Sequence, residues 1–374
     1  MEAFYPLHVY VCEECFLVQL EEYVSPDEIF SDYPYFSSYS DSWLRHAEAY
    51  VDMIIGRLGL SRLSHVVELG SNDGYLLRYF RDREIPVLGV EPAANVAAEA
   101  TSQGIPTEVA FFGVETAEEL VAAGLTADLL IGNNVLAQVP DVNAFVEGMR
   151  IALKPDGVIT MEFPHLLRLV AENQFDTIYH EHFSYFSLSS VTRVFETHAL
   201  TIFDVEELPS HGGSLRIYAR HTEDRTRPLT DRVRELRSRE EAAGVQAIDY
   251  YASFAERVKE TKRKLLEFCI AAKREGKRIV GYGAPGKGNT LLNYCGIRTD
   301  IIDYVVDRSP YKQGRFLPGT HIPIFDPDRI RETRPDYVMI MPWNLKAEIK
   351  EQLSYINEWG GRLVVAIPDL TVID

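Results

Sequence analysis

Along the first half of the chain, stretches with apolar residues at helical spacing alternate with short runs that are typical of buried strands. From residue 46 to residue 60 the apolar residues recur every three or four residues, at Ala49, Met53, Ile54 and Leu58, which predicts a helix. The run HVVELG (65–70) that follows is expected to be extended and predicts a buried strand. Further strands are expected at 87–90, 129–131 and 158–163, with helical stretches between them that include 142–153. This alternation predicts a parallel, doubly wound α/β sheet.

A second alternating block follows a long charge-rich stretch. Residues 221–275 are expected to form a helical connector, a packed spacer whose apolar side carries Tyr251, Phe254, Val258, Leu265 and Leu266. Beyond it we expect a strand at 278–282, a glycine-rich turn, a helix to about residue 294, and strands near 302–306, 337–341 and 363–367. The pattern therefore predicts four parts: a small irregular module (1–45), a first Rossmann-like domain (46–220), the connector (221–275) and a second Rossmann-like domain (276–374).

Charge and composition narrow the classes of partner. The 374 residues include 38 Lys and Arg against 56 Asp and Glu, a formal net charge of −18, which disfavours nucleic acid and anionic membranes as partners. No apolar run has the length of a membrane helix, and the first twenty positions lack the order of a signal peptide. We expect a cytoplasmic protein and, since no repeat or coiled coil argues for assembly, a monomer.

The first glycine-rich turn has the features of a nucleoside site. The run ELGSNDG (68–74) lies between a strand and a helix, where Gly70 and Gly74 allow close approach of a ligand. Glu91 ends the next strand, where an acid can accept hydrogen bonds from ribose hydroxyls. The dinucleotide pattern GxGxxG is absent here, which favours an adenosine with a non-phosphate tail. A plain strand-to-helix turn is the alternative.

This combination resembles the class I S-adenosylmethionine (SAM) methyltransferases. The resemblance implies SAM as the cofactor, with Gly70, Asn72 and Gly74 around its methionine part and Glu91 on its ribose. It also implies Phe111 or Phe112 near the adenine and Asn133 beside the reacting methyl group. The cofactor-binding residues expected on this basis are Glu68, Gly70, Asn72, Gly74, Glu91, Pro92, Phe111, Phe112 and Asn133.

A cluster of histidine, tyrosine and acid follows the strand 158–163. In YHEHFSYF (179–186), two histidines, a carboxylate and a phenol fall within four residues, so they can lie over the carboxyl edge of the sheet. Histidine is the usual general base near neutral pH, and Tyr179 can hydrogen-bond an enolate oxygen. Methylation of carbon requires such a base. A metal held by His180 and His182 with Glu181, or a purely structural cluster, are the alternatives.

Eight motifs, taken together and in order, resemble one three-part family. They are YPLHVYVCEECFLVQL, YPYFSSYSDSW, ELGSNDG, NNVLAQVPD, LKPDGV, YHEHFSYFS, HGGSLR and GYGAPGKGNTLLNYCGI. The resemblance runs from about Tyr5 to the C-terminus. The family is that of the sugar C-methyltransferases, which methylate carbon 3 of nucleotide-linked 4-keto-deoxy sugars. The resemblance implies an N-terminal zinc module, a SAM domain and a C-terminal Rossmann-like domain around the nucleotide sugar.

The resemblance also implies roles for single residues. His182 is expected to remove the carbon 3 proton, supported by Glu181 and Tyr179, while Tyr35 closes over the sugar. The residues expected at the sugar nucleotide, a thymidine diphosphate derivative, are His180, Lys287, Asn289, Thr290 and Arg315, with Lys312 as an alternative to Arg315.

Two departures from the family pattern change these expectations. The zinc module of the family uses four cysteines, whereas only Cys12 and Cys15 are present here; either the chain starts late relative to its relatives or the site is lost, and no complete zinc site is expected. Gln138 stands where relatives often carry a histidine. Because a Gln side chain is no base near neutral pH, proton transfer would depend on His182 alone, or the substrate would differ.

The C-terminal glycine turn also fits a different class of function, an NAD-dependent oxidoreductase. Gly281, Gly283 and Gly286 satisfy GxGxxG, and Asp303 or Asp307 follows at a spacing seen in NAD sites. Against this, Pro285 and Lys287 suggest a turn adapted to a phosphate. Our hypothesis is a SAM-dependent C-methyltransferase of a nucleotide-linked keto sugar. The alternatives are O- or N-methylation of such a sugar, an NAD-dependent oxidoreductase, or a binding protein without catalysis.

Overall fold

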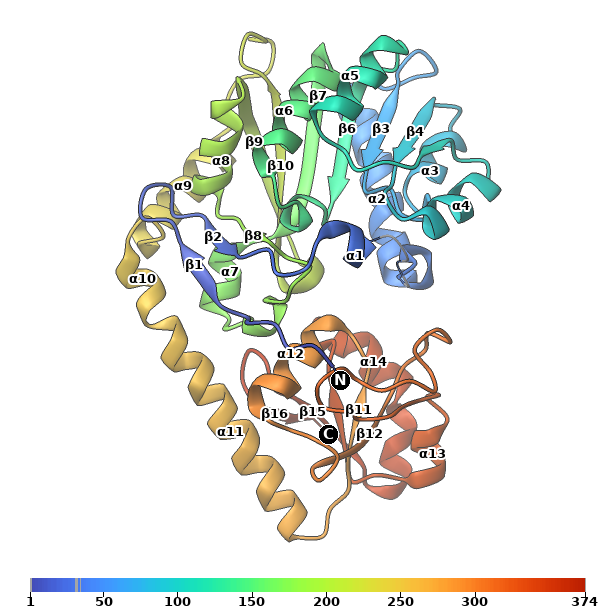
Figure 1. The fold of residues 1–374 in the computed structure, drawn as a ribbon, viewed down its shortest axis with the longest axis vertical. Helices are drawn as coiled ribbons and strands as arrows, with labels where there is room; N and C mark the ends of the chain where they lie inside the picture. The colour runs from blue at the N-terminus through green and yellow to red at the C-terminus, as the bar shows by residue number, and fades with distance from the viewer. Residues whose placement is uncertain (1, 31–32, 34, 374) are drawn as a thin grey trace.

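The computed structural model describes residues 2–30, 33 and 35–373, and two α/β halves lie one above the other in it (Figure 1). The upper half holds a seven-stranded sheet and the lower half a six-stranded sheet. The predicted α/β class is confirmed: two Rossmann-like domains, one in each half, and a small N-terminal module. No helix in these residues is both long enough and apolar enough to cross a membrane.

The N-terminal module is built onto the upper half. β1 (Val9–Val11) and β2 (Val18–Leu20) form a hairpin, and β2 also pairs with β8 (Ser184–Tyr185), which directly follows the histidine cluster. The short helix α1 (Pro26–Phe30) comes next. The first residues reach the lower half, where the carboxylate of Glu2 accepts a hydrogen bond from the Gly319 N–H. The module is therefore ordered by contacts with both halves.

The upper sheet has the strand order β5-β4-β3-β6-β7-β10-β9. Its first five strands are parallel, as the alternating pattern predicts. β10 runs antiparallel to both β7 and β9. Strands β9 and β10 were not predicted from the sequence. The strands are β3 (Val66–Leu69), β4 (Val87–Val90), β5 (Thr107–Glu108), β6 (Ala127–Asn133), β7 (Leu153–Pro164), β9 (Leu200–Leu208) and β10 (Ser214–His221).

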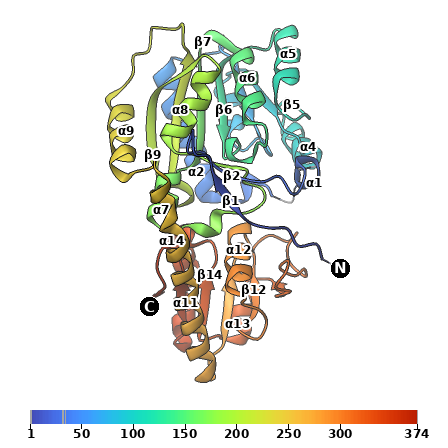
Figure 2. The same cartoon turned by 60° about the vertical axis from the view of Figure 1, so that its left-hand side comes forward.

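Helices cover both faces of this sheet, as Figure 2 shows from the side. They bury apolar side chains against it. One face is covered by α2 and α3, and the other by α5, α6 and α8. The helices are α2 (Asp41–Leu58), α3 (Leu77–Arg81), α4 (Ala94–Ser102), α5 (Val114–Ala122), α6 (Val142–Ala152), α7 (Leu166–Ala171) and α8 (Leu188–Thr197). The predicted helices at 46–60 and 142–153 are thus confirmed.

The charge-rich connector belongs to both cores and is more than a spacer. α9 (Asp231–Ala243) buries Val233 and Leu236 in the upper core. After α10 (Ile248–Ala252), the long helix α11 (Phe254–Arg274) contributes Leu265 and Cys269 to the core of the lower half. The predicted apolar side of the connector is confirmed. Residues of α9 pack in the upper core and residues of α11 pack in the lower core.

The lower sheet has the order β13-β12-β11-β14-β15-β16 and is parallel except for β16. Its predicted strands and its first helix are confirmed within two residues at most ends. The elements are β11 (Ile279–Tyr282), α12 (Gly286–Cys295), β12 (Ile302–Val306), β13 (Ile324–Phe325), α13 (Arg329–Thr333), β14 (Tyr337–Ile340), α14 (Lys346–Gln352), β15 (Arg362–Val365) and β16 (Thr371–Ile373).

Buried polar contacts join the two halves beside the histidine cluster. The Trp343 indole N–H donates to the Asp176 carboxylate at 2.8 Å, and the Thr290 hydroxyl donates to the Ile178 carbonyl at 3.2 Å. Burial raises the pKa of Asp176 to about 7, although Lys287 and Trp343 act in the opposite direction. Such contacts fix the C-terminal half against the segment that carries the expected base.

Candidate functional site

A cavity of about 1880 Å³ lies between the two halves. Its walls come from the N-terminal segment, the carboxyl ends of the upper strands, the histidine cluster, α11 and the turn before α12. Pockets for one small molecule usually measure about 300–1,000 Å³. This cavity therefore has room for two ligands side by side.

The first glycine turn and the end of β4 form one end of the cavity. The two carboxylate oxygens of Glu91 accept hydrogen bonds from the N–H groups of Asn72 and Ala93, each at 2.9 Å. Burial raises the pKa of this carboxyl, while the two N–H groups lower it. Seven of the nine expected cofactor residues line the cavity here: Gly70, Asn72, Glu91, Pro92, Phe111, Phe112 and Asn133.

The other two expected cofactor residues lie behind the wall. Glu68 is completely buried, its carboxylate oxygens have no hydrogen-bond partner among the described residues, and burial raises its pKa well above the usual range. The φ of Gly74 is +74°, and a Cβ at this position would lie 2.9 Å from Cγ1 of Ile105. Gly74 therefore serves the turn and its packing, and the cavity wall in front of it is formed by Gly70 and Asn72.

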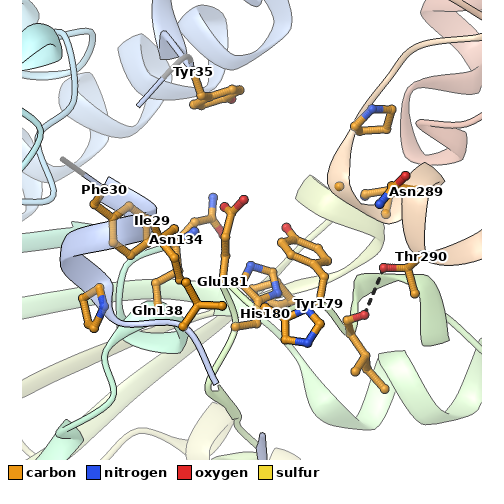
Figure 3. A pocket seen from close by; sticks show the side chains of 18 of the residues that line it. Ile29, Phe30, Tyr35, Asn134, Gln138, Tyr179, His180, Glu181, Asn289 and Thr290 are labelled. Carbon is orange, nitrogen blue, oxygen red and sulfur yellow. Dashed lines mark hydrogen bonds between the residues drawn. The ribbon is translucent and has the colours of Figure 1, made fainter. Parts of the chain in front are cut away.

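Hydrogen bonds join residues 35–38, which follow α1, to the first glycine turn. The Asn72 side chain donates to the Tyr35 carbonyl at 3.2 Å and accepts from the Ser37 N–H at 2.8 Å, and Asp73 accepts from the Ser38 N–H. Tyr35 lines the cavity and is drawn above it in Figure 3. The segment thus covers the cofactor end of the site.

His182 has the geometry of a base. Its Nδ1 lies 3.0 Å from the Thr177 carbonyl oxygen, which can only accept, so Nδ1 carries the proton and Nε2 keeps its lone pair. Burial lowers the pKa of His182 to about 4, Lys287 adds to this, and the Thr177 contact opposes it. The ring is therefore neutral near pH 7 and packs 4.2 Å from the ring of Tyr179.

Tyr179 and Glu181 project side by side into the cavity (Figure 3). The Tyr33 hydroxyl donates to the Glu181 carboxylate at 3.1 Å. Burial raises the pKa of Glu181, whereas Tyr33 and Lys312 lower it. Burial also raises the pKa of Tyr179 well above its usual range, so its phenol stays a hydrogen-bond donor.

His180 faces the N-terminal segment. Its Nε2 lies 3.0 Å from the Pro6 carbonyl oxygen, and its ring has edge contacts with Tyr5 and Tyr23. The residue still borders the cavity, as does Gln138 on the short 3-10 turn Leu136–Gln138. The structure therefore gives His180 a part in holding the N-terminal segment.

The C-terminal half supplies the opposite wall. Lys287, Asn289, Thr290 and Lys312 all line the cavity, whereas Arg315 is exposed on the surface outside it. Lys287 donates to the Asn344 side chain at 2.8 Å, and Lys312 donates to the Ala284 carbonyl at 3.0 Å. Within the described chain, Oδ1 of Asn289 is buried without a hydrogen-bond partner. Of the two alternatives Arg315 and Lys312, the structure therefore brings Lys312 to the site.

Cys12 and Cys15 lie in the turn of the β1–β2 hairpin. Backbone N–H groups lower the pKa of Cys12, and burial raises that of Cys15. Among residues 2–30, 33 and 35–373, no group of three or more His, Cys, Asp or Glu side chains is placed to hold a metal ion. Two thiolates do not fit the four-ligand geometry of structural zinc.

We expect the purified chain to hold well below one zinc ion per molecule. Two cysteines supply half of the usual ligand set, so bound zinc should exchange readily with a chelator. Elemental analysis before and after dialysis against EDTA measures this. One zinc per chain that survives dialysis would contradict the expectation.

A buried charged network behind the cavity is a feature that the sequence did not indicate. Glu162, near the end of β7, accepts from Arg216 at 2.7 Å and from the Ser210 hydroxyl at 2.6 Å, and lies 2.9 Å from Nε2 of His46. Burial alone would raise the pKa of Glu162, but His46, Arg216 and Ser210 outweigh it and hold the pKa at about 2. The partners come from α2, β10 and the loop before β10.

Stability should depend on this carboxylate in acid. Because the pKa of Glu162 falls from 4.5 to about 2 on folding, its contribution is present above pH 4.5 and is lost as the pH drops towards 2. Between pH 6 and pH 3, the wild type should lose about 2 kcal/mol more free energy of unfolding than Glu162→Gln. Urea unfolding at both pH values measures the difference, and equal losses would contradict the assignment.

Comparisons with known proteins cover the whole chain. Three family profiles match in order: a putative zinc binding domain (residues 1–30), a methyltransferase domain (43–204) and a C-methyltransferase C-terminal domain (209–368). The chain is 38% identical to C-methyltransferase NovU of Streptomyces niveus over 377 residues, which cover 100% of this chain and 88% of that protein.

Solved structures resemble parts of the chain. The PH0226 protein of Pyrococcus horikoshii OT3 has a TM-score of 0.40 and 14% identity, and the match covers 54% of this chain and 99% of that one. Magnesium protoporphyrin IX methyltransferase (ChlM) of Synechocystis PCC 6803 with bound SAM has a TM-score of 0.36 and 13% identity, over 48% of this chain and 81% of that one.

Proposed function

Since this chain belongs to the C-methyltransferase family and is a SAM-dependent methyltransferase, we propose that it methylates carbon 3 of a nucleotide-linked 4-keto-deoxy sugar. The observation that carries the proposal is the position of His182. An imidazole with a free Nε2 lies in a cavity large enough for two ligands, between the cofactor end and the C-terminal half. Methylation of carbon requires a base at this place, whereas many O- and N-methylations proceed largely by proximity.

The proposed mechanism assigns one task to each group. Bound SAM supplies an electrophilic methyl group, for which Gly70, Asn72 and Glu91 form the fitting end of the cavity. His182 takes the proton from carbon 3 on Nε2, and the electron pair of that C–H bond moves into an enolate. When SAM is bound, its methyl group would pass to carbon 3 of this enolate and S-adenosylhomocysteine would be left. The imidazolium afterwards returns its proton to water.

We assign the nucleotide to the C-terminal wall. Lys312 and the unpartnered amide oxygen of Asn289 supply a charge and an acceptor there, which suits a diphosphate and a base such as thymine. An NAD site at the same turn has less support. Asp303 lies near the amino end of β12, and Asp307 accepts from the N–H groups of Ala284 and Ser309. The proposal includes a cytoplasmic, monomeric enzyme, on the grounds of composition given above.

Deuterium exchange tests the proposal. The protein is incubated in D₂O with S-adenosylhomocysteine and each of a panel of thymidine diphosphate 4-keto-deoxy sugars, and the protons of the sugar are followed by NMR. We expect exchange at carbon 3 with one or more sugars, and C-methylation of the same sugars once SAM replaces S-adenosylhomocysteine. Methyl transfer to oxygen or nitrogen without exchange, or oxidation coupled to NAD, would overturn the proposal.

A further inference from the structure

A second imidazole faces the cavity, from the short turn Ser210–Gly212 before β10. His211 lines the cavity together with Asn134, which directly follows β6. Nδ2 of Asn134 lies 3.4 Å from Nε2 and 3.5 Å from Nδ1 of the His211 ring. Both residues have φ of +55°, a backbone conformation that non-glycine residues adopt at an energetic cost. Such strain persists only where the surroundings hold it, and it clusters at functional sites.

The surroundings hold the His211 turn from several sides. The Ser210 hydroxyl donates to Glu162, and the Gly213 N–H donates to the Ser210 carbonyl. The edge of the His211 ring meets Trp43, with 5.0 Å between ring centroids and an interplanar angle of 83°. At Gly212, whose φ is +91°, a Cβ would lie 2.4 Å from the Trp343 ring, so the C-terminal half also fixes the turn.

The ring is uncharged where it lies. Burial lowers the pKa of His211 to about 4, and the charges and imidazoles that act on it are Lys287, Glu162, His46 and His182. A neutral imidazole has one N–H to donate and one nitrogen that accepts. His211 is therefore equipped to donate a hydrogen bond near neutral pH.

We propose that His211 donates a hydrogen bond to the keto oxygen of the substrate while His182 removes the neighbouring proton, and that Asn134 is a positioning residue for the His211 ring. The inference rests on the proposed function. Negative charge forms on that oxygen when the C–H bond breaks, and a fixed donor stabilises it most at that moment. His182 by itself supplies no group for this oxygen, because its Nδ1–H is bound to Thr177 and its Nε2 is the base. The donors that line the cavity beside it are the Tyr179 phenol, expected at the enolate oxygen from the sequence, and the His211 ring, which adds a second donor.

Two substitutions at one position test the role. His211→Phe keeps a ring but removes the donor, and His211→Gln restores an N–H at similar reach. We expect His211→Phe to lower both carbon 3 exchange and kcat by about 100-fold, with an unchanged Kd for S-adenosylhomocysteine. His211→Gln should recover at least about ten-fold of that loss. His198→Phe, at a histidine that directly follows α8, bonds Glu147 of α6 and lies outside the cavity, is the matched control and should keep the exchange rate and kcat of the wild type.

The outcomes separate this inference from the function on which it rests. If wild type exchanges and His211→Phe exchanges equally fast, the donor role is wrong and the proposed function stands. If His211→Phe and His211→Gln lose activity equally, or the loss appears in S-adenosylhomocysteine affinity or in the melting temperature instead, His211 is structural and the donor role is also wrong. If wild type exchanges no keto sugar of the panel, the proposed function fails and takes this inference with it.

Discussion

Replacement of His182 by Asn should abolish nearly all turnover and leave SAM binding intact. The Asn amide can still donate to the Thr177 carbonyl as Nδ1 does, so the local fold keeps its hydrogen bond while the basic Nε2 is lost. General-base catalysis is worth about 10²- to 10⁴-fold, and we expect a fall in kcat of about 10³-fold. Steady-state kinetics with the sugar identified by exchange measures it, and calorimetric titration with S-adenosylhomocysteine measures the unchanged affinity.

The neighbouring His180 offers a matched control. It belongs to the same segment and also borders the cavity, but its Nε2 contacts the Pro6 carbonyl. His180→Asn should lower kcat by less than about ten-fold, well below the range for loss of a general base. Full activity of His182→Asn, or equal losses for the two variants, would remove His182 from the role of base.

The sequence was informative where local patterning decides the outcome. The apolar period at 142–153 corresponds to α6, and the strand expected at 158–163 lies within β7, because each buries a stripe or face that the sequence itself defines. Gly70 and Glu91 were also placed at one sheet edge correctly. In parallel sheets the carboxyl ends of neighbouring strands meet, so strand order was sufficient to bring these residues together.

Tertiary contacts decided the rest. His180 and His182 are two residues apart in an irregular segment, and nothing local tells which ring turns to Thr177 and which to Pro6. The apolar side of α11 was recognised, but a helical period does not say which of two cores it joins. His211 reaches the cavity because a turn with positive φ is held by Glu162 and Trp343, which lie far from it in the sequence.

Glu91→Gln should weaken SAM binding by about 100-fold or more. As a ribose ligand, the carboxylate would accept two hydrogen bonds, each worth about 1.5–3 kcal/mol when the acceptor is charged. The substitution removes the charge. In the wild type, the N–H groups of Asn72 and Ala93 both donate to the Glu91 carboxylate. In Glu91→Gln the amide N–H₂ faces one of these N–H groups, so the glycine turn loses a hydrogen bond. Calorimetric titration with SAM and with S-adenosylhomocysteine measures the loss.

The control has to separate binding from folding, because Glu91 serves the turn as well as the ligand. Glu99→Gln removes an equal charge from the exposed side of α4 and should leave the Kd unchanged. Thermal melting without ligand shows how far Glu91→Gln disturbs the turn. Melting at one fixed SAM concentration shows what binding adds, since the stabilisation rises with the logarithm of the ligand concentration divided by its Kd. If Glu91→Gln binds SAM as wild type does, the acid acts on the backbone alone and the ribose lies elsewhere.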